Sequence, residues 1–212
     1  MRKTVLVRGP ALSRSGYGEQ TRFALRALRS REDLFDIYLT NVGWGHTGQI
    51  ADKDEFSQWL HFLMQKTNFF LQGGNKCQVS LQVTIPNEWE KLCDYNIGFT
   101  AGIETTKVAP VWIVKGNEMV DSILVVSNHA KSVYQNTSYR AENKETGEVV
   151  EDFRLQTPVH VTNYPVRLYE PEALDLELTT DFNFLAVAQW GPRKNITNTI
   201  NWFVEEFHDT EG

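Results

Sequence analysis

The sequence predicts an α/β fold, in which a parallel β-sheet is covered by helices on both faces. Short apolar segments alternate with amphipathic segments of helical length over most of the chain. Residues 97–101 and 123–126 are apolar without alternation, which is typical of parallel strands buried on both faces. Pro110 lies between them and favours the first turn of a helix. A strand, a helix and a strand in this order indicate a parallel sheet.

The composition limits the classes of protein. The chain has 212 residues, of which 41% are hydrophobic, and a net charge of −6. These values fit a globular protein with no general affinity for nucleic acid or anionic membranes. Cys77 and Cys93 are too few for a disulfide framework, and no metal-ligand spacing surrounds them. We find no membrane span and no signal peptide in the sequence and therefore expect a cytoplasmic location.

The first predicted elements are strands at residues 4–7 and 36–40, with a helix at about 19–29 between them. The face of this helix opposite its apolar residues carries three arginines, Arg22, Arg26 and Arg29. These arginines form either a solvated helix face or a docking surface for an anionic partner.

Gly16 and Gly18 precede this helix in a predicted loop. Their spacing to Thr21 is a degraded form of the dinucleotide-binding fingerprint. In that fingerprint the first glycine follows the strand directly, and the second strand ends in an acidic residue that binds the ribose. Here loop residues intervene and the second strand ends in Thr40, so we reject a dinucleotide site. The glycines either bring the backbone close to a ligand or form a turn that requires positive φ.

A glycine-rich loop follows the second strand, and its His46 is a candidate to face a substrate. Residues 52–54 then form an Asp-x-Asp pattern of the kind that binds metal in some glycosyltransferases. They open an amphipathic helix over residues 56–63, where acidic side chains complement the helix macrodipole. We therefore expect no metal site there. Residues 79–85 alternate between apolar and polar side chains, which predicts a strand that is half buried or at a sheet margin.

Polar residues directly follow the two central strands, 97–101 and 123–126. In open α/β sheets, ligands bind in the crevice outside the carboxyl ends of the strands. The sequence therefore predicts one cleft at this edge, lined by Gly16, Gly18, Glu104, Thr105, Ser127 and Asn128.

The rest of the chain departs from the α/β alternation. Residues 139–156 are polar and predict a β-hairpin insertion around a turn at 145–148. Residues 159–162 are a further predicted strand. Residues 168–180 are acidic without a sharp period, which indicates a linker. The apolar segment 182–188 predicts a new strand, and a helix with several large apolar residues follows it.

The central segment carries a pattern of a known family. One strand ends in Glu104-Thr105, the following helix has an early Trp112, and the next strand ends in Val126-Ser127. This pattern resembles the amino-terminal lobe of GT-B glycosyltransferases of the retaining family 4 type.

The resemblance implies a Rossmann-like, acceptor-side domain over residues 1–170, with the hairpin at about 139–156 as an insertion. It further implies a linker at 171–181 and the first strand and helix of a donor-binding domain at 182–212. The hairpin is a departure, because the family usually has a shorter connection there.

The family also implies donor-binding residues. Arg193 and Lys194 match an Arg-Lys pair that binds the donor diphosphate, and the helix after them offers free amides to an anion. The loop with Gly16 and Gly18 would contact donor or acceptor. The chain departs from the family at Gln189, where members often have Arg or Lys, so that one phosphate contact would be weaker or absent.

The implied activity is the transfer of a sugar from a nucleotide-sugar donor to a glycan or other small acceptor, with retention of configuration and without a metal or another cofactor. Glu104 and Thr105 would be the catalytic residues, which orient sugar hydroxyls or, for Glu104, act as an acid or base. Glu104 could instead cap or pair with the following helix.

We expect this chain to be an incomplete and inactive fragment, because it stops just after the first helix of the implied second domain. The exposed apolar surface of residues 182–212 would then pack on the first domain, lead to self-association, or stay loose. The alternative function is a non-catalytic module that binds a sugar nucleotide or a glycan.

Overall fold

The computed structural model describes residues 2–51, 54–142, 147, 149–188 and 190–208. The chain divides into two compact units. The first unit is Met1–Val166 and the second unit is Arg167–Gly212, so the border falls next to the predicted boundary at residue 170.

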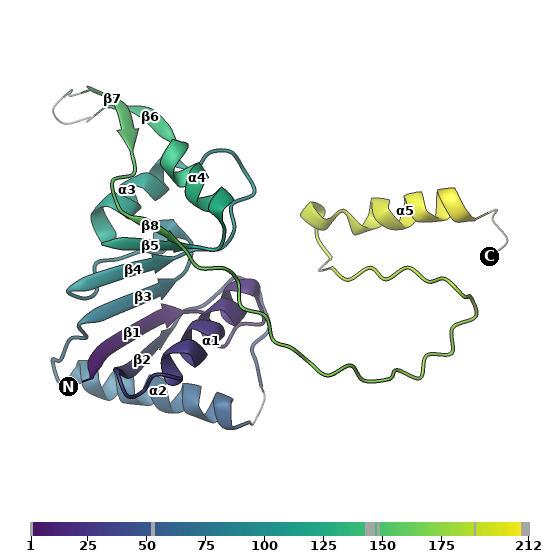
Figure 1. The fold of residues 1–212 in the computed structure, drawn as a ribbon, viewed down its shortest axis with the longest axis horizontal. Coiled ribbons are helices and arrows are strands. Elements are labelled where there is room, and N and C mark those ends of the chain that lie inside the picture. The colour runs from purple at the N-terminus through teal and green to yellow at the C-terminus, as the bar shows by residue number, and fades with distance from the viewer. Residues whose placement is uncertain (1, 52–53, 143–146, 148, 189, 209–212) are drawn as a thin grey trace. The chain divides into compact units, whose positions relative to one another are not determined.

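The first unit is built around a six-stranded parallel sheet with the strand order β2-β1-β3-β4-β5-β8. All five pairings are parallel, so the strand arrows in Figure 1 point the same way and every carboxyl end lies at one edge. The parallel α/β fold is confirmed. The strands are β1 (Lys3–Gly9), β2 (Phe35–Asn41), β3 (Val79–Val83), β4 (Tyr95–Phe99), β5 (Ser122–Val125) and β8 (Val159–Val161).

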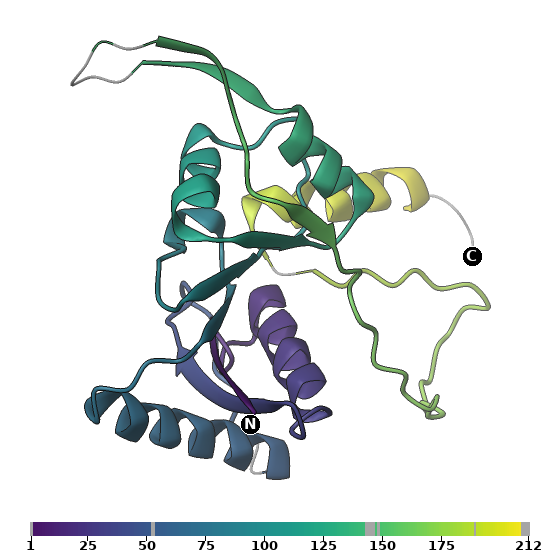
Figure 2. The ribbon, with the colours of Figure 1, turned by 60° about the vertical axis from the view of Figure 1, so that its left-hand side comes forward.

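Helices flank this sheet: α1 (Gly16–Arg29), α2 (Glu55–Gln72), α3 (Pro110–Met119) and α4 (Asn128–Asn136). Successive residues of a strand point to opposite faces. Leu124 of β5 shares a core cluster with Tyr17 and Ala24 of α1, whereas Ile123 of β5 shares another with Ile113 of α3. Helices α1 and α3 therefore cover opposite faces, as Figure 2 shows.

The strand order reverses beside β1, because the chain passes from β1 to β2 on one side and continues from β3 to β8 on the other. Such a reversal is a topological switch point, outside which ligands bind in open α/β sheets. Helix α1 begins close to this point. A Cβ built on Gly9, the last residue of β1, would lie 2.5 Å from Thr21 Oγ1 of α1.

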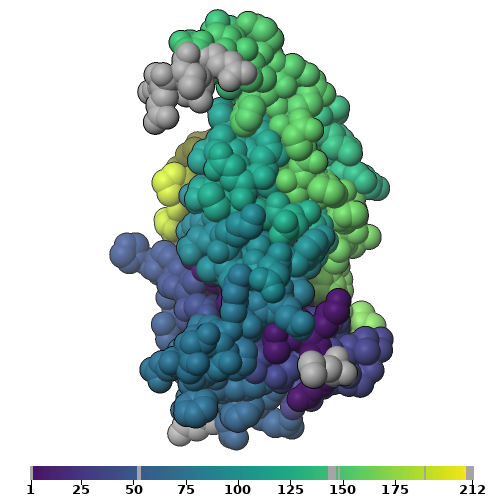
Figure 3. All heavy atoms as spheres, turned by 90° about the vertical axis from the view of Figure 1, so that its left-hand side faces the viewer, coloured from purple at the N-terminus to yellow at the C-terminus, as the bar shows by residue number. Residues whose placement is uncertain are grey.

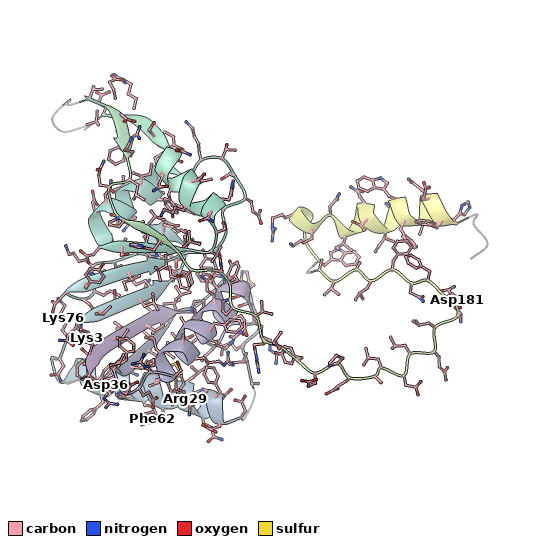
Figure 4. The ribbon with its side chains drawn as sticks, in the orientation of Figure 1. Lys3, Arg29, Asp36, Phe62, Lys76 and Asp181 are labelled. Atoms are coloured by element: carbon pink, nitrogen blue, oxygen red, sulfur yellow. The ribbon has the colours of Figure 1, made fainter. Side chains whose placement is uncertain are left out.

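Helix α2 binds backbone and side-chain groups of the edge strand β2. Thr67 Oγ1 accepts the amide of Leu39 and donates to the carbonyl of Leu63, each at 2.7 Å. Lys66 of the same helix binds Asp36 of β2 at 2.7 Å, at the edge where Figure 4 labels Asp36. The edge strand therefore presents fewer unpaired groups to another chain.

The predicted hairpin is confirmed. Strands β6 (Ser138–Glu142) and β7 (Val149–Arg154) pair antiparallel in a separate two-stranded sheet. This sheet projects from one end of the first unit in Figures 1 and 3. Asn117 of α3 anchors its return, since it donates to the carbonyl of Arg154 and accepts the amide of Gln156. Of the predicted turn, Glu145, Thr146 and Glu148 lie outside the described residues.

The second unit contains a short 3₁₀ turn (Pro192–Lys194) and α5 (Ile196–Phe207). Residues 182–188 form neither helix nor strand, which differs from the predicted strand. A strand needs a neighbour with which to exchange backbone hydrogen bonds, and the described part of this unit provides none. The segment instead contacts α5 through aromatic rings. The ring centroid of Phe184 lies 5.2 Å from that of Phe203 and 5.5 Å from that of Phe207.

The substitution Thr67→Val tests the edge of β2. It keeps the volume but leaves the buried amide of Leu39 without its acceptor, so we expect a loss of about 1–3 kcal/mol in the free energy of unfolding. Thr105→Val is the matched control, because Thr105 donates only within an exposed turn, and we expect a change of about 0.5 kcal/mol or less. Urea unfolding measures both, and equal losses would contradict this account of the edge.

Candidate functional site

The start of α1 differs from the prediction. Ser15 caps the helix, because its Oγ accepts the amide of Gly18 at 3.1 Å. The helix therefore begins at Gly16 rather than at about residue 19, and both glycines lie in its first turn instead of in a loop. Neither has a positive φ, so the interpretation as a left-handed turn is wrong.

The two glycines have different surroundings. Gly18 is buried, and a Cβ on it would lie 2.1 Å from the carbonyl oxygen of Ser13. Its close backbone approach is therefore to its own chain. Gly16 is exposed and has no atom within 4 Å of its Cβ position. Of the two, Gly16 is the residue that leaves room for a ligand.

Arg22 fixes the loop between β1 and α1. Its Nη1 donates to the carbonyls of Ala11 and Ser13, both at 2.8 Å, and its guanidinium pairs with Glu19 at 2.7 Å. The side chain is buried. Arg22 is therefore part of neither a solvated helix face nor a docking surface, and both interpretations are wrong for it. The charge pattern alone did not distinguish Arg22 from Arg26 and Arg29.

The glycine-rich loop after β2 packs against the loop after β1. Ser13 Oγ lies 2.7 Å from Thr47 Oγ1, and Asn41 Oδ1 accepts the amide of Leu12 at 3.0 Å. Together they line a recess of about 120 Å³ that also includes Trp44. His46 is exposed on the same loop but is not among the residues that line the recess.

Tyr17, in the helix after β1, contacts residues that follow β4 and β2. Its hydroxyl lies 3.0 Å from Thr100 Oγ1, directly after β4, and accepts the amide of Ala101 at 3.1 Å. Its ring centroid lies 4.6 Å from that of Trp44 in the loop after β2. Tyr17 was not among the predicted site residues, although its position between Gly16 and Gly18 was a visible signal.

Glu104 and Thr105 lie in the loop between β4 and α3, at the same edge as Gly16. Both side chains are exposed, and Thr105 Oγ1 donates to the carbonyl of Lys107 at 2.8 Å. The N-cap of α3 is Ala109, which has no side-chain cap. Glu104 is therefore not the N-cap of that helix.

Ser127 and Asn128 follow β5, the strand that pairs with β4. Ser127 is the N-cap of α4, and its Oγ accepts the amide of Ala130 at 3.1 Å. Asn128 is exposed at the first position of the helix. The parallel topology thus brings Glu104, Thr105, Ser127 and Asn128 to one edge with Gly16. Their positions after the strands in the sequence predict this arrangement.

Arg193 and Lys194 belong to the second unit. They are exposed in the 3₁₀ turn that directly precedes α5. Asn195 joins the two elements in a left-handed conformation, with φ 52°, and makes no side-chain cap. Two cationic side chains thus stand beside the amino end of a helix, where backbone amides favour an anion. Gln189 lies outside the described residues.

The remaining candidates for site chemistry have structural roles. Asp54 is the N-cap of α2 and accepts the amide of Ser57 at 2.7 Å, while Asp52 and Lys53 lie outside the described residues. Burial raises the pKa of Cys77 to about 12 and that of Cys93 to about 11, so neither thiol is a ready nucleophile at neutral pH. The described part of the chain holds no group of three or more metal-ligating side chains.

Comparisons of this chain with protein-family models, with curated proteins and with solved structures gave no match. Among the described helices, none has the length and apolarity needed to cross a bilayer.

The pair Gly18→Ala and Gly16→Ala tests the geometry at the start of α1. We expect Gly18→Ala to lower the free energy of unfolding by roughly 2 kcal/mol or more, because its methyl group would meet the backbone of Ser13. We expect Gly16→Ala to be neutral or to stabilise by up to about 1 kcal/mol, because the position is open and alanine favours helix.

Urea unfolding of both variants decides this prediction. If Gly18→Ala were as stable as Gly16→Ala, the helix start would not lie this close to the loop after β1.

Proposed function

We propose that this chain takes part in the transfer of a sugar from a nucleotide-sugar donor to a glycan or other small acceptor, as part of a retaining GT-B glycosyltransferase. One observation carries the proposal: Glu104, Thr105 and Ser127 follow two paired parallel strands, β4 and β5, at the carboxyl edge of the sheet. Ligand sites of open α/β sheets lie at this edge. The sequence pattern that resembles the family falls on the same residues.

The first unit would bind the acceptor. Glu104 is exposed, and a carboxylate there can accept a hydrogen bond from a sugar hydroxyl or take its proton. The hydroxyl of Thr105 already donates to a carbonyl and retains its capacity to accept. Each of the two side chains thus has an oxygen that would accept a hydrogen bond from an acceptor hydroxyl.

The second unit would contact the donor. Cleavage of a nucleotide-sugar bond leaves a diphosphate, whose developing charge must be stabilised. In the proposal Arg193 and Lys194, together with the first amides of α5, supply that positive potential. None of the described residues of this unit is buried. Because catalysis requires groups fixed by packing, we expect donor contact without ordinary turnover from this chain alone.

A second candidate function, a glycan-binding module without catalysis, is favoured by the recess beside the same edge. There the ring of Trp44 adjoins the hydroxyls of Ser13 and Thr47 and the amide of Asn41. An apolar ring face next to a few polar groups is a usual composition of a small-molecule site, but the volume of about 120 Å³ is below the roughly 300 Å³ of a whole ligand pocket, so the recess would take a single group of a glycan. This function needs no contribution from Arg193 or Lys194.

Binding measurements with the variant Glu104→Gln test the proposed function. Titration calorimetry of the chain with UDP-glucose, GDP-mannose, ADP-glucose and a panel of oligosaccharides should find both a donor and a glycan that bind. We expect Glu104→Gln to weaken glycan binding roughly tenfold or more, because a charged hydrogen-bond acceptor is lost. Glu118→Gln is the control, since Glu118 is also exposed but lies in the last turn of α3.

The outcomes separate the two candidates. Binding of glycans without any nucleotide sugar would favour the module. Absence of both kinds of binding would contradict both candidates, and turnover on the order of 1 per second would contradict the expected lack of activity.

A further inference from the structure

The hydroxyl of Tyr17 makes its hydrogen bonds to the loop that carries Glu104. It accepts the amide of Ala101 at 3.1 Å and lies 3.0 Å from Thr100 Oγ1. Burial raises the pKa of Tyr17, so the phenol keeps its proton at neutral pH. It can therefore donate to Thr100 while it accepts from Ala101. A side chain of α1 thus binds two successive residues at the end of β4.

The ring of Tyr17 is itself fixed by two other parts of the edge. It packs against the core cluster of Val83, Phe99 and Val126, which come from β3, from β4 and from the residue after β5. On another side its centroid lies 4.6 Å from that of Trp44. The position of the hydroxyl is therefore set by contacts outside the loop that it binds.

The loop from Thr100 to Ala109 is attached to the rest of the unit at both ends and also near its middle. There the amide of Gly102 donates to the hydroxyl of Tyr164 at 3.2 Å, and Ile103 packs against the core cluster of Ile113. At the far end Val108 donates its amide to Thr137 Oγ1 at 3.2 Å and accepts from the hydroxyl of Tyr139 at 2.7 Å. Glu104 lies between the attachments at the two ends and is exposed.

The start of the loop is bound to α1 by the hydroxyl of Tyr17 and by a longer hydrogen bond, 3.5 Å, from Gln20 Nε2 to the carbonyl of Thr100. The location of Glu104 relative to Gly16 therefore depends in part on Tyr17.

We propose that Tyr17 is a positioning residue, which fixes the start of the loop from Thr100 to Ala109 against α1 and so contributes to the place of Glu104 at the edge. The assignment of this loop to acceptor binding rests on the proposed function. The fixation of the loop by the hydroxyl does not, and it can be measured without any ligand. Tyr17 then acts through Glu104 and needs no contact with a substrate of its own.

The pair Tyr17→Phe and Tyr139→Phe tests the proposal. Each variant keeps its ring and loses one hydroxyl, but the two hydroxyls attach opposite ends of the same loop. Amide hydrogen exchange of the whole chain is measured by NMR, with the amide of Leu39 in β2 as the internal reference. We expect exchange at Ala101, relative to Leu39, to rise roughly tenfold in Tyr17→Phe, because that amide loses its acceptor.

In Tyr139→Phe we expect the same ratio to stay within about twofold of that of the unchanged chain. An equal rise in both variants, or a rise in Tyr17→Phe that Leu39 shares in full, would show a general loss of stability and overturn the proposal. An unchanged ratio in Tyr17→Phe would also overturn it.

Titration with maltotriose and UDP-glucose separates this result from the proposed function. If neither probe binds the unchanged chain, the proposed function loses its support, while the exchange ratios still decide the role of Tyr17. If maltotriose binds, its affinity should fall in Tyr17→Phe and not in Tyr139→Phe, and an equal affinity in all three chains would contradict the positioning role.

Discussion

The close approach of α1 to the end of β1 is the constraint on which the rest of the first unit depends. Side-chain carbon is excluded at two points: a Cβ on Gly9 would meet Thr21, and a Cβ on Gly18 would meet the backbone of Ser13. Because glycine occupies both positions, the helix can begin directly over the switch point of the sheet. Arg22 then closes the intervening loop with two hydrogen bonds to its carbonyls.

The consequences of this contact extend to the other strand ends. With α1 in this place, the side chain of Tyr17 reaches the residues after β4 and the ring of Trp44 in the loop after β2. The candidate site is therefore formed by several loops at the carboxyl edge of the sheet and not by a single motif. Gly16 lies on one side of the switch point and Glu104 on the other. The proposed sugar transfer uses this edge as the side on which an acceptor is placed.

Local patterns of the sequence were sufficient to predict the parallel sheet, the helix after Ser127 and the hairpin at 139–156, since each depends on periodicity and turn residues in one segment. The cap at Ser15 was missed because the glycines after it resemble a loop. The segment 182–188 has the apolarity of a strand but lacks a described partner. The contact between Tyr17 and Thr100 joins residues 83 positions apart in the chain, and it depends on strand order, which spacing alone does not give.

The central claim is that the carboxyl edge of the first unit is its ligand site, and NMR shift mapping of the isotope-labelled chain tests it most directly. On titration with maltotriose and with UDP-glucose, we predict that the amides of the first unit that shift most are those near Gly16, Trp44, Ala101 and Ser127. A competing hollow in the first unit, a recess of about 460 Å³ lined by residues such as Tyr38 and Phe69, lies away from these loops. Shifts concentrated there, with none at the carboxyl edge, would contradict the account.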